Sequence, residues 1–122
     1  MKIFMVIGSL NASVAVIMGA FGAHALREKL TTDMMSVYQT AVQYHFFHAL
    51  GLFVVAFVVG QYPHVVVSRW SGWLMLVGIL LFSGSLYGLS LSGTGWLGAI
   101  TPMGGTAFII SWTLLAIAVA KG

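Results

Sequence analysis

The chain has 122 residues, of which 60% are hydrophobic and 6% are charged. A soluble domain carries about 25% charged residues, so this composition excludes an ordinary water-facing surface and requires that most of the surface face lipid. The net charge of +3 comes from basic residues that are scattered near predicted helix ends. This distribution is typical of interfacial anchors, not of a nucleic-acid-binding patch, and the absence of cysteine excludes disulfides, iron–sulfur clusters and thiol catalysis.

The first apolar run predicts a helix over about residues 3–23. A single lysine precedes it and Ala23-His24-Ala25 follows it, which resembles the start and cleavage site of a signal peptide. The run is long for a signal core and rich in small residues, and about 20 apolar residues suffice to cross a membrane. We therefore interpret it as a retained first transmembrane helix, followed by a charged connection.

Three more apolar runs predict helices over about residues 33–60, 69–91 and 102–120. Asp33, after two threonines, marks a candidate N-cap region for the second helix, and Pro102 is tolerated in the first turn of the last. The connection over 95–105 is apolar yet contains helix breakers. Two interpretations stay open: a short apolar turn at the interface, or a segment that folds back into the bundle with Thr101 capping the last helix.

These runs predict the fold class. Only helices and closed barrels satisfy every backbone hydrogen bond in lipid, and the runs are continuous where barrel strands would alternate. We expect an all-α integral membrane protein, a four-helix transmembrane bundle in which residues 1–122 form a single transmembrane domain.

The orientation follows from the short loops. Lys2, Arg69 and Lys121 fall on one predicted side of the membrane, and Arg27 and Lys29 fall on the other. The excess of basic residues favours both termini in the cytoplasm. A margin of one residue is also typical of a protein that inserts in both orientations.

Small residues in two predicted spans indicate close helix packing. Gly19 and Gly22 lie in the first span, and Gly84 and Gly88 form a GxxxG pattern in the third. Such residues let helix backbones approach closely in lipid. The pattern is compatible with packing inside one bundle and with an interface between copies of the chain.

The second predicted helix has two polar faces. At 100° per residue, one face carries Tyr38, Ala41, His45 and His48, and roughly the opposite face carries Ser36, Gln39, Thr40 and Gln43. This pattern predicts a central helix that is packed on both sides in its outer half.

The candidate functional residues are the polar groups within the spans, because such groups are costly in lipid. His24, His45 and His48 could step inward from one interface, with both deeper rings pointing at one partner. Such a ladder could ligate a metal or haem, relay protons or receive a quinone head group. The alternative is that these histidines are structural, hydrogen-bonded to neighbouring helices. Asn11 is expected to bridge helices.

No acid–base or nucleophilic set is visible, since no carboxylate lies in a predicted span. We therefore expect no catalytic residues and no enzyme activity, and most simply no cofactor. Three hypotheses stay open: a non-enzymatic membrane factor or accessory subunit, a small channel or transporter assembled from several copies, and a haem, metal or quinone site on the histidines.

Four motifs in order give the chain a family resemblance: residues 19–26, Tyr44-His45 with His48-Ala49, residues 82–87, and residues 101–105. Together they resemble the membrane family known as domain of unknown function 423, with its YgdD-like, YwdK-like and transmembrane protein 256-like members. The resemblance implies a four-span protein, located in bacteria in the inner membrane, and implies no activity. It places a set of residues in the family pattern: His24, Tyr44, His45, His48, Tyr87, Thr101 and Pro102.

Overall fold

The computed structural model describes residues 1–122 and contains helices without strands. The first two spans are α1 (Lys2–His24) and α2 (Thr32–Gln61). The third consists of α3 (Val67–Gly78), the π-helical segment η1 (Ile79–Ser83) and α4 (Gly84–Ser92), and the 3₁₀ turn η2 (Gly95–Ala99) leads into α5 (Thr101–Lys121). Four helical stretches are long and apolar enough to cross a membrane. The predicted fold class is confirmed, and each span lies within two residues of its predicted limits.

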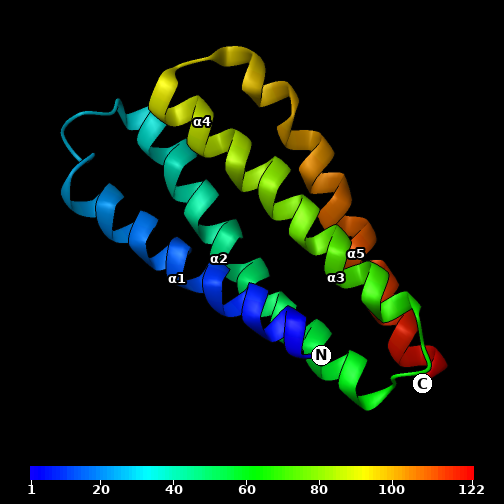
Figure 1. Cartoon of the computed structure of the whole chain (residues 1–122). Helices are drawn as coiled ribbons and strands as arrows, with labels where there is room; N and C mark the ends of the chain where they lie inside the picture. The colour runs from blue at the N-terminus through cyan, green and yellow to red at the C-terminus, as the bar shows by residue number, and fades with distance from the viewer.

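The four spans run side by side as an elongated bundle (Figure 1). α1 packs along α2, and α5 packs along α3 and η1. α2 also contacts α3, η1 and α4, so it is the central helix of the bundle. The chain ends lie together at one end of the molecule (Figure 1).

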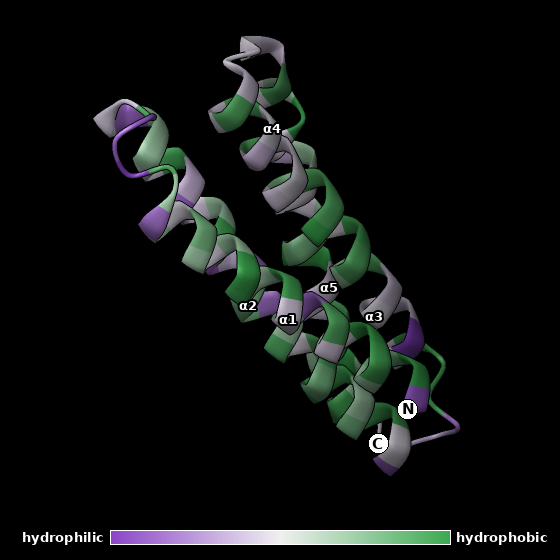
Figure 2. Cartoon of the chain, turned by 60° about the vertical axis from the view of Figure 1, so that its left-hand side comes forward, coloured by the Kyte–Doolittle hydropathy of each residue, from purple (hydrophilic) through white to green (hydrophobic).

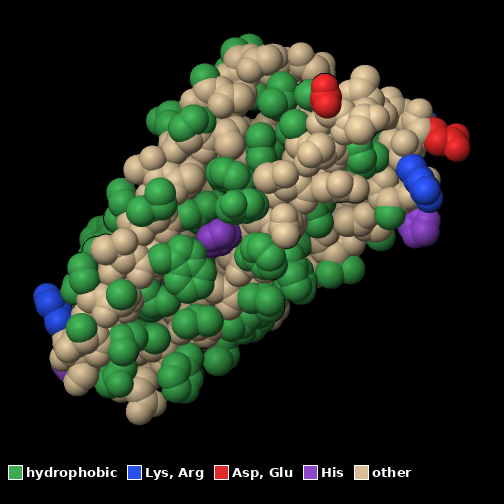
Figure 3. Space-filling view, turned by 180° about the vertical axis from the view of Figure 1, so that it is seen from behind, with side chains coloured by type: hydrophobic (Ala, Val, Ile, Leu, Met, Phe, Trp, Pro, Cys, Tyr) green, Lys and Arg blue, Asp and Glu red, His purple; other side chains and the backbone are tan.

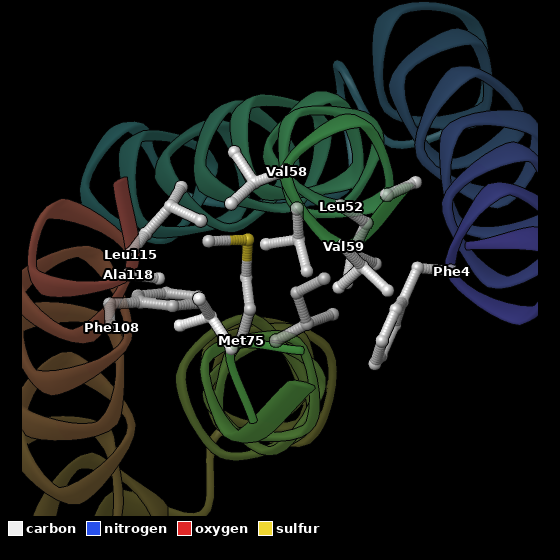
Figure 4. Packing of buried hydrophobic residues seen from close by; sticks show 12 residues of the cluster. Phe4, Leu52, Val58, Val59, Met75, Phe108, Leu115 and Ala118 are labelled. Atoms are coloured by element: carbon white, nitrogen blue, oxygen red, sulfur yellow. The ribbon is translucent and has the colours of Figure 1, made fainter. Parts of the chain in front are cut away.

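The apolar core fills one half of the bundle, between the C-terminal half of α2 and the helices beside it. Leu52, Val55 and Met75 are fully buried there, and Phe4 and Phe108 close the core from α1 and α5 (Figure 4). Lipid tails are as apolar as these side chains, so their contribution in a membrane is close packing instead of escape from water.

The third span is interrupted at the place where α5 comes nearest to it. A Cβ atom on Gly104 of α5 would lie 2.3 Å from the backbone nitrogen of Phe82 and 2.8 Å from the carbonyl carbon of Leu81. Both residues belong to the π segment Ile79–Ser83. The backbones of α5 and η1 therefore touch, and only glycine fits at position 104.

The ends of the bundle carry the charge, and an apolar band separates them. Figure 2 shows this band along the helices, and Figure 3 shows Lys, Arg, Asp and Glu side chains confined to the two ends of that face. Trp70 and Trp73, which are 62% and 42% exposed, follow Arg69 at one end. Amphipathic tryptophans favour the headgroup level, so this end has the anchors of a membrane interface.

Two details at the helix ends differ from the sequence prediction. The N-cap of α2 is Thr31, whose side-chain oxygen accepts a hydrogen bond from the Met34 amide at 3.1 Å, and Asp33 lies in the first turn. Thr101 does not cap α5, which has no side-chain cap bond. The connection before it is a 3₁₀ turn with Trp96 67% exposed, which agrees with an apolar turn at the interface.

Candidate functional site

His45 joins three helices at one point. Its Nε2 lies 2.9 Å from Oδ1 of Asn11 on α1, and its Nδ1 lies 3.0 Å from the hydroxyl of Tyr87 on α4. Asn11 uses its amide nitrogen to donate to the carbonyl of Ile7 at 2.9 Å, so its oxygen faces the histidine. An amide oxygen only accepts. Nε2 of His45 therefore donates to Asn11, and in the neutral ring Nδ1 accepts from the Tyr87 hydroxyl, so both nitrogens are used.

His48 makes the corresponding link to α5 with the opposite tautomer. Its Nε2 accepts from the indole N–H of Trp112 at 3.0 Å, because an indole can only donate. Its Nδ1 donates to the Tyr44 carbonyl at 2.7 Å. The ring lies flat on Phe108, with centroids 3.5 Å apart and planes 9° apart. His48 is thus also fully bonded while neutral.

The three histidines do not form a shared site. His45 faces α1 and α4, His48 faces α5, and His24 is exposed at the end of α1. The expectation that both deeper rings point at one partner is wrong, because residues three apart on a helix diverge by about 60° and a different helix lies against each ring. No group of three His, Cys, Asp or Glu side chains is placed to hold a metal ion.

Hydroxyl groups fasten the remaining helix pairs. Ser71 of α3 and Ser111 of α5 each donate to the other's backbone carbonyl, at 2.8 and 2.7 Å. Ser85 and Thr101 pair at 2.6 Å. Two further bonds cross to or from α2: Ser83 to the Ala41 carbonyl and Tyr38 to the Met18 carbonyl. Every buried side-chain polar atom has a partner, so the polar groups inside the bundle work as cross-links.

Asn11 bridges helices as the sequence predicted, whereas Tyr44, which belongs to the family pattern, makes no side-chain hydrogen bond between helices. Tyr44 is 38% exposed, and its ring packs on Phe82 with centroids 4.5 Å apart. Sequence reasoning missed Trp112, which holds His48. A signal for it exists: this tryptophan lies in the middle of the last span, away from the interface, where its N–H needs an acceptor.

The predicted packing glycines behave differently from one another. A Cβ on Gly19 would meet Val42 at 3.3 Å and one on Gly22 would meet Tyr38 at 2.3 Å, so both sit against α2. Gly88 lies near Leu97 of the following turn, at 2.9 Å. Gly84 has nothing within 4 Å. Gly84 is therefore not in close contact inside the bundle and opens onto a groove of about 240 Å³ between α1 and α4, and the alternative of an interface between copies stays a prediction for it.

The second polar face of α2 is not packed. The first face is buried as predicted, with Tyr38, Ala41, His45 and His48 inside the bundle. Ser36, Gln39 and Gln43 on the opposite face are exposed. The expectation that both faces are covered is wrong, because α1 packs against Tyr38 and Val42 and leaves both glutamines exposed.

The comparisons with known proteins agree with a small membrane protein. Residues 18–105 match the model of a family described as protein of unknown function DUF423. The UPF0382 membrane protein YwdK of Bacillus subtilis is 52% identical over 99% of this chain and 98% of its own length. UPF0382 membrane proteins of Staphylococcus epidermidis and Staphylococcus saprophyticus are 49% and 46% identical, over 99% of this chain and 98% and 99% of theirs. No solved structure matches.

Proposed function

Since the chain belongs to the DUF423 family of small membrane proteins, we propose that it is a non-enzymatic accessory subunit that acts through helix contacts within the membrane. The observation that carries this proposal is the use of the polar side chains in the spans. The Asn11–His45–Tyr87 and His48–Trp112 links tie α1, α2, α4 and α5 together. Their ring nitrogens are already bonded, which suits fastening and not proton transfer or ligation.

The small number of residues outside the membrane-spanning helices supports the same proposal. The connections between the spans are residues 25–31, 62–66 and 93–100, and the spans take up nearly all the rest of the chain. A partner would therefore meet this protein mainly through lipid-facing helix surfaces. We propose further that it lies in the cytoplasmic membrane with both termini inside, because the excess of basic residues, Lys2, Arg69 and Lys121, falls at the helix ends beside the termini.

Extraction of native membrane patches tests this proposal. Membranes that hold the untagged partner proteins and a tagged copy of this chain are dispersed into polymer-bounded discs, and the intact particles are weighed by native mass spectrometry. We expect a particle in which this chain is present at fixed stoichiometry with further protein mass. A bare monomer in every preparation, or a bound chromophore or metal at one per chain, would contradict an accessory role.

A further inference from the structure

The surface of α1 and α2 around Gly19, Ala20, Gln43 and Phe47 has features that the bundle itself does not use; we refer to it as the Gln43 face. Two surface grooves of about 420 and 510 Å³ meet there, and Gly19, Val42 and Gln43 line both. The Gln43 side chain is exposed and makes no hydrogen bond within the chain. An exposed carboxamide is ordinary in water and unusual on a surface that faces lipid.

The depth of Gln43 decides whether water can satisfy it. Gly19 lies against Val42, so Gln43 is level with this part of α1. His24 ends α1 and begins the charged connection. Five residues at 1.5 Å each place Gln43 about 7 Å inside that boundary. Gln39 lines the same groove one turn nearer the boundary and can reach water. At a depth of about 7 Å the Gln43 amide has less access to water, and an unpaired polar group in hydrocarbon is costly.

The shape of the Gln43 face is complementary to itself. Phe47 is 53% exposed and forms a ridge on α2. Gly19 and Ala20 leave the groove of about 510 Å³ on α1, immediately beside it. A ridge on one copy can therefore enter the groove of another. A carboxamide is likewise complementary to itself, because it has both donors and acceptors. A lipid chain could fill the groove but offers the amide no hydrogen bond.

We propose that a second copy of this chain, inserted in the same orientation, docks on the Gln43 face and pairs its Gln43 with that of the first. This proposal rests on the proposed function and deepens it by naming the partner. A two-fold axis along the membrane normal places the two amides at equal depth, and small residues with interhelical amide bonds are the known means of association in lipid. Copies in opposite orientations would hold the amides about 16 Å apart in a hydrocarbon core of about 30 Å.

The test measures the dimer dissociation constant in vesicles of phosphatidylethanolamine and phosphatidylglycerol. Energy transfer is recorded between dyes on Gly95→Cys, a site where an added Cβ meets nothing within 4 Å, over a range of protein-to-lipid ratios. Gln43→Leu removes the amide, and Ala20→Phe fills the groove on α1. The matched control is Ala116→Phe, which fills a groove of about 450 Å³ on the α2–α5 surface. All three positions are exposed, so the bundle keeps its internal contacts, and circular dichroism checks this.

We expect a wild-type dimer whose dissociation constant rises at least about tenfold in Gln43→Leu and in Ala20→Phe and less than about twofold in Ala116→Phe. A wild-type monomer at all ratios, or a dimer that responds equally to all three changes, would overturn the proposal. The native membrane patches separate it from the proposed function. A stoichiometric particle that holds one copy and a different protein overturns the second copy alone, whereas a bare monomer overturns both.

Discussion

His48 shows how a single residue in lipid fixes the arrangement of its neighbours. The Tyr44 carbonyl only accepts and the Trp112 indole only donates, so one tautomer satisfies both. In the hydrocarbon core no water replaces a lost partner. The link between α2 and α5 therefore has one bonded geometry, and sliding either helix by a turn would leave two polar groups unpaired.

Trp112→Phe tests the strength of this link. The change keeps an aromatic ring and removes the N–H, which leaves Nε2 of His48 without its donor. We expect the free energy of unfolding to fall by about 1 kcal/mol, the size of an interhelical hydrogen bond in a membrane protein. Denaturant unfolding in detergent, followed by circular dichroism, measures the change without relying on tryptophan fluorescence.

Trp96→Phe is the matched control for that variant. Trp96 is 67% exposed and its indole donates no hydrogen bond within the chain, so its replacement should leave the unfolding free energy unchanged. Adding His48→Phe to Trp112→Phe removes the unpaired nitrogen and keeps a ring on Phe108, so part of the loss should return. Equal stability of Trp112→Phe and wild type would show that the link does not stabilise the bundle.

At the scale of elements, the π segment and Gly104 form one packing feature. A π turn widens a helix locally, and here it presents the backbone of Leu81 and Phe82 to α5. The same segment directs the Ser83 hydroxyl to the Ala41 carbonyl on α2, at 2.9 Å. The interruption of the third span thus serves two neighbours at once, α5 by contact and α2 by a hydrogen bond.

Gly104→Ala should disrupt this contact, and Gly105→Ala should not. The added methyl at position 104 would lie 2.3 Å from a backbone atom, so α5 must move; at position 105 the nearest atom is a Phe82 ring carbon at 3.8 Å. We expect Gly104→Ala to lower the unfolding free energy by about 2 kcal/mol, the usual cost of overpacking. The same unfolding experiment measures both. Equal effects of the two changes would mean that general glycine flexibility, and not this contact, sets the stability.

The spans, the buried face of α2 and the bridging role of Asn11 could be predicted from the sequence, because length, apolar content and helical spacing determine them locally. The direction of each glycine could not. Gly84 and Gly104 look alike in sequence, yet one is open and the other touches a backbone. The difference depends on which helix lies opposite, as does the divergence of His45 from His48. The π segment Ile79–Ser83 leaves no local sequence mark.

At the scale of the whole molecule, the bundle has two unlike ends. One end holds both termini with Lys2, Arg69 and Lys121, and the other holds Arg27 and Lys29 beside the two acidic residues. Basic residues in short loops set the orientation, and acidic ones contribute little. The paired amides of the proposed dimer require copies that insert in the same orientation. The orientation therefore determines both the side of the membrane on which the termini lie and whether two copies can pair.

Cysteine labelling in intact cells tests the orientation, because the native chain has no cysteine. Single variants are Gly95→Cys at the end without the termini and Gly122→Cys at the C-terminus. A membrane-impermeant maleimide should label Gly95→Cys in intact cells and Gly122→Cys only after the cells are opened, since the excess of basic residues retains the terminal end inside. Labelling of both variants to about half in intact cells would indicate insertion in both orientations. Each copy could then pair its Gln43 only with the copies that share its orientation, so the dimer fraction in native membranes would fall.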